Sequence, residues 1–195
     1  MRATPLLMSG IEPESQAQAE FAILLERAAA GDVSAFERIV ARYERRVLSL
    51  AWRLLGRPED AEDASQEVFL RAFRYLHRFD RRRPFEPWLM KMTVNVCHDV
   101  GKKRQWQVSS VIDPDALCRT DNPHDDLHSE EQKKMLYKAL QQLPQKERAA
   151  VVLRDIEGFS TAEVAGILGS SEATVRSQIS TARLKIRKAV KWGRV

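Results

Sequence analysis

The sequence predicts an all-α fold with two small helical domains joined by a flexible acidic linker, the second of them a helix-turn-helix domain. Apolar residues recur at helical spacing through most of the 195 residues, and the strict alternation typical of a strand is absent. One long segment lacks periodicity and is rich in acids and proline, which favours a linker. The predicted parts are a mobile tail at 1–20, a first domain at 21–106, the linker at 107–129 and a second domain at 130–195.

Composition indicates a cytoplasmic globular protein. Hydrophobic residues make up 44% of the chain, yet no segment holds the roughly 20 uncharged apolar residues that membrane insertion of a helix needs. The apolar patch near the N-terminus is too short for a secretory signal. Cys97 and Cys118 show no metal-ligand spacing and are expected to be structural or incidental thiols, so we predict neither a metal nor a cofactor.

Charge is distributed in blocks along the chain. The net charge is +5 and the pI is about 9.4, which favours an anionic partner such as nucleic acid. Seven acids and a single base lie between Asp113 and Glu131, whereas the stretch from Arg176 to Arg194 holds seven bases and no acid. A second basic cluster lies at 102–104. Two basic regions separated by an acidic one suit two nucleic-acid contacts joined by a segment that avoids DNA.

Capping residues and helix breakers divide the first domain into four expected helices. The periodic stretch 21–55 is interrupted at Gly31-Asp32, after which Ser34 is the expected N-cap and Glu37 completes a capping box. Pro58 ends the second helix because proline cannot continue the hydrogen-bond ladder. The remaining expected elements are a third helix at about 58–76, a loop at 78–87 and a fourth helix at about 88–104.

The second domain carries the breakers of a four-helix unit. Pro144 and Gly158 separate helices, and Gly169-Ser170-Ser171 supplies a turn. The predicted helices run up to residue 143 and over 146–156, 160–168 and 172–191. The last two, with a permissive glycine between them, have the pattern of a helix-turn-helix, whose second helix lies in the DNA major groove.

The final helix has two distinct faces. The apolar face consists of Val175, Ile179, Ala182, Ile186 and Ala189. The opposite face near the N-terminal end can bond to base edges and holds Arg176, Ser177, Ser180 and Thr181. The cations that would meet backbone phosphate are Arg183, Lys185, Arg187, Lys188 and Lys191. The alternative is an amphipathic helical hairpin with a solvated basic face.

Acidic side chains crowd the start of the third helix, and three interpretations are open. The side chains are Glu59, Asp60, Glu62, Asp63 and Glu67. They could complement the helix dipole, dock a basic partner, or bind magnesium for an enzyme activity. A magnesium site would need paired carboxylates facing each other across a bundle, and no second acidic helix is predicted.

Several segments, taken in order, resemble the extracytoplasmic-function (ECF) sigma factors of bacteria. The segment from Asp60 to Phe73 is similar to the polymerase-binding segment of that family. The residues similar to its first helix are Ala35-Phe36 and Tyr43. Those similar to its −10 region are Trp88-Leu89, Asn95, Asp99 and Lys103-Arg104. Residues similar to its −35-binding domain are Leu140, Leu143-Pro144, Glu147-Arg148, Gly158 and Thr174-Val175-Arg176-Ser177. The ordered set covers about residues 23–190.

The resemblance implies a transcription initiation factor and not an enzyme. Such a protein binds RNA polymerase core, through its β′ and β subunits, and directs it to the −10 and −35 elements of promoter DNA. It would be a monomer when free and would need no cofactor, and an anti-sigma factor is an expected partner. The residues implied in docking on a coiled coil of β′ are Asp60, Glu62, Asp63, Gln66 and Glu67.

The resemblance also implies where the −10 element binds. The loop after the third helix would take up a base flipped from the non-template strand. Phosphate would be held by Arg81, Arg82 and Arg83, and the base would stack on Phe85 or Trp88. The helix face beside this loop holds Trp88, Lys91, Asn95, Asp99 and Lys102. Asn95 is the leading candidate for a base contact; the alternatives are a core position for Trp88 and a capping or solvent role for Asn95.

For the −35 element the resemblance implies contacts from the final helix. The residues are Thr174, Arg176, Ser177, Gln178, Ser180, Thr181, Arg183 and Arg187. Gln178, Ser180 and Thr181 stand where the family usually has more basic residues, so the base preference does not transfer. The main rival is a conventional helix-turn-helix regulator with an N-terminal sensor domain, which would be a dimer on a palindromic site.

Overall fold

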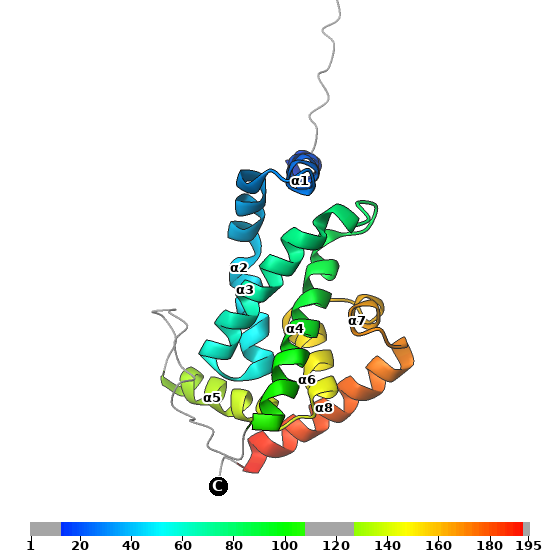
Figure 1. Cartoon of the computed structure of the whole chain (residues 1–195). Coiled ribbons are helices and arrows are strands. Elements are labelled where there is room, and N and C mark those ends of the chain that lie inside the picture. The colour runs from blue at the N-terminus through cyan, green and yellow to red at the C-terminus, as the bar shows by residue number, and fades with distance from the viewer. Residues whose placement is uncertain (1–12, 108–126, 193–195) are drawn as a thin grey trace, which may run out of the picture.

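The computed structural model describes residues 13–107 and 127–192, and these ranges contain helices and no strand (Figure 1). This confirms the all-α prediction. The helices are α1 (Pro13–Ala29), α2 (Val33–Leu55), α3 (Pro58–Tyr75), α4 (Phe85–Gln107), α5 (Leu127–Gln141), α6 (Gln145–Val151), α7 (Thr161–Leu168) and α8 (Glu172–Trp192), with a 3₁₀ turn η1 (Leu76–Arg78) and a π-helical turn η3 (Val152–Ile156). Within this part of the chain, no helix is long and apolar enough to cross a membrane. Most of the predicted linker and the first twelve residues of the predicted tail lie outside the described residues.

Helices α1–α4 form an N-terminal bundle around α2. The buried face of α2 consists of Ala35, Phe36, Ile39, Val47, Leu50, Ala51 and Leu54. Helix α3 packs on it through the small side chains Ala61, Ala64, Val68 and Ala72, and α4 adds Leu89, Met90 and Val96. Because alanine has no long side chain, α3 lies close to α2 and presents its polar residues outward.

The cap of α2 differs from the prediction. Asp32, and not Ser34, is the N-cap, since its carboxylate accepts a hydrogen bond from the Ala35 amide at 3.1 Å. Arg27 donates to the same carboxylate at 2.7 Å. These two contacts hold the pKa of Asp32 below its usual value. A carboxylate that meets both the helix N-terminus and a guanidinium is a stronger cap than a serine hydroxyl.

Two helices begin earlier than predicted. Helix α1 starts at Pro13, inside the stretch expected to be a tail, and α4 starts at Phe85, inside the expected loop. Proline is tolerated in the first turn of a helix because the amide hydrogen that it lacks has no partner there. Pro13 and Pro87 therefore lie in the first turns of these helices and do not block them.

Helices α5–α8 form a C-terminal bundle, and Pro144, Gly158 and Gly169 separate its helices as predicted. Ser160 caps α7 in a capping box: the Glu163 amide donates to Ser160 Oγ at 3.2 Å, and the Ser160 amide donates to Glu163 Oε2 at 2.8 Å. Gly169 ends α7 with a left-handed φ of 61°, which turns the chain tightly into α8. The helix-turn-helix predicted from the sequence is confirmed.

The two bundles pack against each other and share one apolar core, an arrangement that the sequence did not predict. Gln141 Nε2 donates to the carbonyl of Arg53 at 3.1 Å, and Arg148 Nη1 donates to the carbonyl of Leu54 at 2.5 Å. Arg148 Nη2 also donates to the carbonyls of Gln141 and Leu143, at 2.6 and 3.1 Å. One guanidinium therefore satisfies carbonyls at the ends of helices from both bundles.

We predict that Arg148→Ala lowers the free energy of unfolding by about 2–4 kcal/mol, because it leaves buried carbonyls without a donor. Burial lowers the pKa of Arg148 to about 10, so the group stays charged at neutral pH. Urea unfolding followed by circular dichroism measures the loss. The exposed Arg45→Ala is the matched control, with an expected change within about 0.5 kcal/mol. Equal losses in both variants would contradict the assignment.

Candidate functional site

The outer face of α8 is available to a ligand along most of its length. Val175, Ile179 and Ala182 are buried against the rest of the bundle. Arg176, Ser177 and Ser180 are exposed, and Thr181 is half-buried. The apolar and polar faces of α8 therefore lie where helical spacing predicted them. In a helix-turn-helix the N-terminal part of the second helix reaches base edges, and these three exposed residues occupy that part.

Several cations of α8 are already paired with acids. Arg176 lies 2.6 Å from Glu172 one turn earlier, and Arg183 lies 2.6 Å from Asp155 in η3. Hydrogen bonding to Asp155 raises the pKa of Arg183 above its usual value. Lys185 makes a 2.7 Å pair with Glu147 of α6. Arg183 and Lys185 thus both pair with acids of the same C-terminal bundle.

The other predicted −35 residues lie near the ends of this surface. Thr174 Oγ1 is 2.8 Å from Ser171 Oγ in the turn. Gln178 is half-buried, and its Oε1 is one of the buried side-chain atoms in the described residues without a hydrogen-bond partner. Arg187 is exposed and lines an apolar groove between α5, η3 and α8 together with Arg183 and Leu136.

Helix α4 presents a polar face that matches the prediction for four of its five residues. Lys91, Asn95, Asp99 and Lys102 are exposed. Asp99 lies 3.4 Å from Arg71 of α3. The fifth residue, Trp88, is half-buried.

The aromatic residues at the start of α4 form a cluster. Phe85 is 5% exposed, and its ring centroid lies 5.4 Å from Tyr43, 5.6 Å from Phe79 and 5.4 Å from Trp88. Phe85 is thus enclosed by other rings and has no free face for a base. Of the two aromatic candidates for stacking, Trp88 is the one with exposed surface.

The arginines of the preceding loop are exposed. Arg81 lies 3.1 Å from Glu26 of α1, and Arg83 lies 3.7 Å from Asp80. Arg82 is exposed as well, and its amide donates to Asp80 Oδ1 at 3.1 Å. Exposed pairs of this kind contribute little stability, so phosphate can compete for the guanidinium groups.

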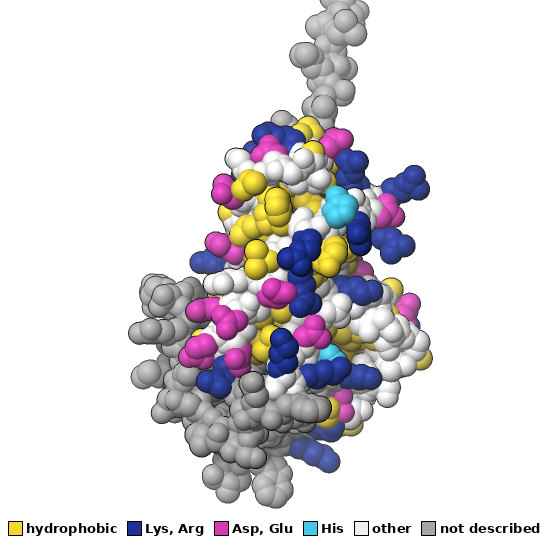
Figure 2. Space-filling model, in the orientation of Figure 1, with side chains coloured by type: hydrophobic (Ala, Val, Ile, Leu, Met, Phe, Trp, Pro, Cys, Tyr) yellow, Lys and Arg dark blue, Asp and Glu magenta, His cyan; other side chains and the backbone are white. Residues whose placement is uncertain are grey.

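The acidic residues of α3 separate into an outward set and an inward set. Glu62, Asp63 and Gln66 are exposed, whereas Asp60 is half-buried and has an interaction of its own. Glu67 lies 2.6 Å from Arg71, and this hydrogen bond raises the pKa of the guanidinium. Figure 2 shows acidic side chains gathered on the left of the molecule at about mid-height, with hydrophobic ones above them.

Two apolar residues on α3 extend the outward set and were missed by the sequence reasoning. Leu70 is 64% exposed and Phe73 is 40% exposed. They follow Gln66 by four and seven residues, so they continue its stripe along the helix. The signal was present in this spacing, because a leucine and a phenylalanine on the polar face of an amphipathic helix indicate a contact surface.

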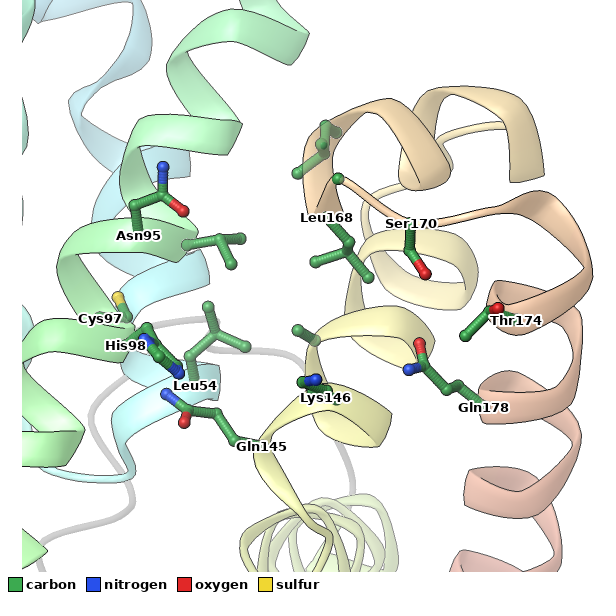
Figure 3. A pocket seen from close by; sticks show the side chains of 14 residues that line it. Leu54, Asn95, Cys97, His98, Gln145, Lys146, Leu168, Ser170, Thr174 and Gln178 are labelled. Atoms are coloured by element: carbon green, nitrogen blue, oxygen red, sulfur yellow. The ribbon is translucent and has the colours of Figure 1, made fainter.

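A cavity of about 330 Å³ lies between α4 and the helix-turn-helix. Asn95 and His98 line it from α4, and Thr174 and Gln178 line it from α8 (Figure 3). Cys97 lines it too, and burial raises the pKa of this thiol to about 12, which makes it unreactive at neutral pH. Residues predicted to bind two different promoter elements therefore face each other across one space.

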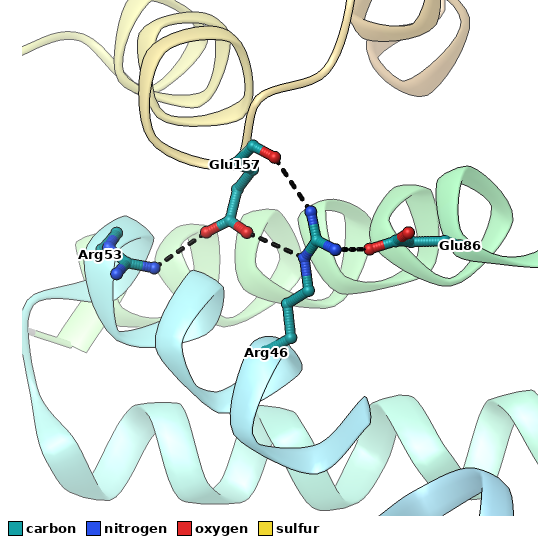
Figure 4. A network of polar contacts seen from close by, with 4 residues as sticks. All are labelled: Arg46, Arg53, Glu86 and Glu157. Atoms are coloured by element: carbon teal, nitrogen blue, oxygen red, sulfur yellow. Dashed lines mark hydrogen bonds and ion pairs between the residues drawn. The ribbon is translucent and has the colours of Figure 1, made fainter. Parts of the chain in front are cut away.

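A network of ion pairs joins the two bundles (Figure 4). Glu157, which precedes Gly158, lies 3.1 Å from Arg46 and 2.8 Å from Arg53, both on α2. Its side chain is only 6% exposed. Arg46 also pairs with Glu86 of α4 and donates to the Glu157 carbonyl at 2.9 Å. No spacing pattern along the sequence predicts this network, because Glu157 lies more than 100 positions from its two partners on α2.

No metal centre is formed in the described ranges, where no group of three or more His, Cys, Asp or Glu side chains is placed to hold an ion.

Two family models match the chain in the same order as these surfaces. Residues 39–107 match Sigma-70 region 2, and residues 133–186 match Sigma-70, region 4. The RNA polymerase sigma-H factor of Pseudomonas aeruginosa is 32% identical over 177 residues, which cover 86% of this chain and 92% of that protein. The chain is an ECF-type RNA polymerase sigma factor.

Other relatives of this sigma factor agree. The ECF RNA polymerase sigma-E factor of Escherichia coli K12 is 34% identical over 171 residues, covering 83% of this chain and 89% of that protein. The solved structure of CnrH in complex with the cytosolic domain of CnrY matches with a TM-score of 0.64 and 29% identity, over 87% of this chain and 96% of that chain. A sigma factor initiates transcription, so the rival interpretation as a conventional regulator is not favoured.

Proposed function

We propose that this sigma factor divides its work between the two bundles: the N-terminal one holds RNA polymerase core and the −10 element, and the C-terminal one binds the −35 element. The observation that carries the proposal is that three different polar surfaces, on α3, α4 and α8, are exposed on one chain. A regulator that only binds DNA would need the surface on α8 alone.

The docking surface for polymerase is the outward stripe of α3. Glu62, Asp63 and Gln66 supply the polar end of this stripe, and Leu70 and Phe73 supply an apolar end. A basic-edged coiled coil of β′ is complementary to both ends. Charge on the rim of such an interface speeds association, and the apolar end adds buried area.

The −10 surface combines the loop arginines with the exposed face of α4. Arg81, Arg82 and Arg83 would hold phosphate, Trp88 would stack on an unpaired base, and Asn95 would bond to a base edge. Phe85 is left out because its ring is enclosed. Its part is to fix the position of Trp88, which it contacts.

The −35 surface is the N-terminal part of α8. Arg176, Ser177 and Ser180 are exposed and point away from the bundle, so they can enter a major groove. Arg183 is exposed further along α8, and phosphate can displace Asp155 from its pair with this guanidinium. Lys188 is exposed further along α8 and is placed to meet phosphate.

The setting follows from the family. A factor that works with RNA polymerase acts in the cytoplasm, and it needs no catalytic group of its own because the polymerase supplies the chemistry. CnrH was solved in complex with the cytosolic domain of CnrY, and another similar structure pairs the sigma factor RpoE of Bartonella quintana with the anti-sigma factor NepR. We propose that this chain, too, has an anti-sigma partner.

The double substitution Glu62→Gln with Asp63→Asn should weaken binding to core polymerase by about 1–2 kcal/mol, roughly a tenfold loss, because it removes two exposed charges from the docking stripe. Fluorescence anisotropy of the labelled chain titrated with core enzyme measures the affinity. Glu44→Gln, an exposed acid on α2, is the matched control and should leave the affinity unchanged. Identical affinities for all three proteins would remove α3 from the interface.

Asn95→Ala should impair promoter opening more than closed-complex formation, since a base contact exists only after the strands separate. Permanganate footprinting reports opening, and filter binding at low temperature reports the closed complex. Lys91→Ala, one turn earlier on α4, should weaken both steps alike because it loses a phosphate contact. Equal losses with Asn95→Ala would count against its contact with a base.

Arg176→Ala should weaken −35 binding by about 1–3 kcal/mol and relax the base preference at one position. A panel of promoter variants in a transcription assay measures the preference. Lys188→Ala should instead weaken binding evenly across the panel, as a phosphate contact does. An unchanged preference with Arg176→Ala would refute the assignment.

A further inference from the structure

Helix α1 lies against the loop that we propose to bind the −10 element, yet it belongs to none of the three proposed surfaces. The match to Sigma-70 region 2 begins at residue 39, so α1 precedes it. Figure 1 shows α1 at the end of the N-terminal bundle where the chain turns from α3 into α4, and α1 contacts η1 there. This helix is therefore placed to influence how the loop lies.

Phe21 of α1 extends the aromatic cluster at the start of α4. Its ring centroid lies 5.8 Å from that of Tyr43 on α2 and 5.7 Å from that of Phe85 on α4. Phe85 in turn contacts Phe79 and Trp88, whose own centroids are 5.1 Å apart. Aromatic pairs at these distances have preferred orientations, so a shift of one ring moves its neighbours. The position of Trp88 therefore depends on Phe21 through Phe85.

The same cluster fixes both ends of the −10 loop. Phe79 precedes the loop and Phe85 follows it, and both side chains are buried. Their centroids lie 5.6 Å apart with the ring planes at 88°, which is the edge-to-face arrangement that aromatic rings favour. The residues between them, 80–84, are all exposed and include the three loop arginines. The exposed loop is thus held on a base of rings, and Phe21 packs on one of them.

Two guanidinium groups keep α1 in this position. Arg42 of α2 lies 4.7 Å from the centroid of the Phe21 ring, as in a cation–π contact. Arg81 of the loop lies 3.1 Å from Glu26 of α1. The pair between Arg81 and Glu26 is exposed, so phosphate can replace the carboxylate. The ring contact of Phe21 with Phe85 uses no group that would bind DNA, so DNA binding does not have to break it.

We propose that Phe21 is a positioning residue for the −10 element: it holds Phe85, and through it Trp88 and the loop, where they can receive an unpaired base. The proposal rests on the proposed function, from which it takes the role of Trp88. Phe21 itself would not touch DNA. A base that stacks on a displaced Trp88 no longer aligns its edge with the residues that read it, so loss of Phe21 should reduce discrimination among −10 sequences.

The test is in vitro transcription by holoenzyme, made from the full chain and core polymerase, on a promoter that the wild type selects from a library. One panel of templates varies single bases of the −10 element, and a second panel varies the −35 element. Phe21→Ala should lower the −10 discrimination about three- to tenfold, which is part of what one base contact supplies, and should leave the −35 preference unchanged. Phe21→Tyr keeps the ring and should behave as the wild type does.

Leu25→Ala is the matched control, because Leu25 is a buried residue of the same helix and has no ring to contact Phe85. If α1 only covers the core, Leu25→Ala and Phe21→Ala should lose discrimination equally, and that result would overturn the proposal. A folded Phe21→Ala with an unchanged −10 preference, where Trp88→Ala changes it, would overturn it too. Where Phe21→Ala loses its helical circular dichroism, Phe21→Leu takes its place, since it keeps most of the apolar volume and removes the ring.

Nuclear magnetic resonance of the free chain gives a second readout, which needs no DNA. The indole N–H signal of Trp88 is assigned by its loss in Trp88→Phe. This signal should move further in Phe21→Ala than in Leu25→Ala, because the rings beside Trp88 move when Phe21 is removed. A Trp88 signal that stays in place in Phe21→Ala would contradict the positioning role.

The positioning role and the proposed function fail separately. Trp88→Ala tests the proposed −10 surface directly in the same panel of templates. An unchanged preference in Trp88→Ala removes Trp88 from that surface, and the Trp88 signal in Phe21→Ala then decides the positioning role alone. A changed preference in Trp88→Ala, together with a Trp88 signal that Phe21→Ala leaves in place, keeps the proposed surface and removes the positioning role.

Discussion

The C-terminal end of α2 is the constraint on which the rest of the structure depends. Every α-helix leaves its last carbonyls without partners inside the helix, and here the carbonyls of Arg53 and Leu54 are satisfied by Gln141 and Arg148 from the other bundle. Gly56 then turns the chain with a φ of 75°, at a point where a Cβ would meet the side chain of Gln141. The C-terminal bundle therefore packs at the end of α2, where the N-terminal bundle needs hydrogen-bond donors.

This packing of the C-terminal bundle determines which surfaces are exposed. Helix α3 follows directly from the turn at Gly56 and packs on α2 through alanines, so its carboxylates and the apolar pair Leu70 and Phe73 face outward. Helix α4 instead lies beside α7, and for that reason Asn95 looks into the cavity. The surface proposed to bind polymerase faces outward along α3, whereas Asn95 of the proposed −10 surface also lines the cavity beside the helix-turn-helix.

Sequence periodicity was sufficient to predict the helices, the helix-turn-helix and the two faces of α8, because these features depend on residues within one or two turns of each other. The errors concern helix ends, where neighbouring residues offer alternative starts. Asp32 and not Ser34 caps α2, because Arg27 holds its carboxylate in place. Pro87 lies within α4, because the first turn of a helix tolerates proline. The packing of the bundles was beyond prediction. It depends on side chains bonded to partners about 90 to 110 positions away, such as Arg148 and Glu157, and no spacing rule encodes such pairs.

The ion pairs of this chain fall into two kinds with different responses to salt and to ligands. Arg176 and Arg183 are 66% and 54% exposed in their pairs with Glu172 and Asp155, so water screens them and a DNA phosphate can displace the acid at little cost. The Glu157 side chain is only 6% exposed, so salt screens its pairs less than it screens the exposed ones. The surface proposed to bind DNA is built from exposed pairs, and the junction between the two bundles is built around a buried carboxylate.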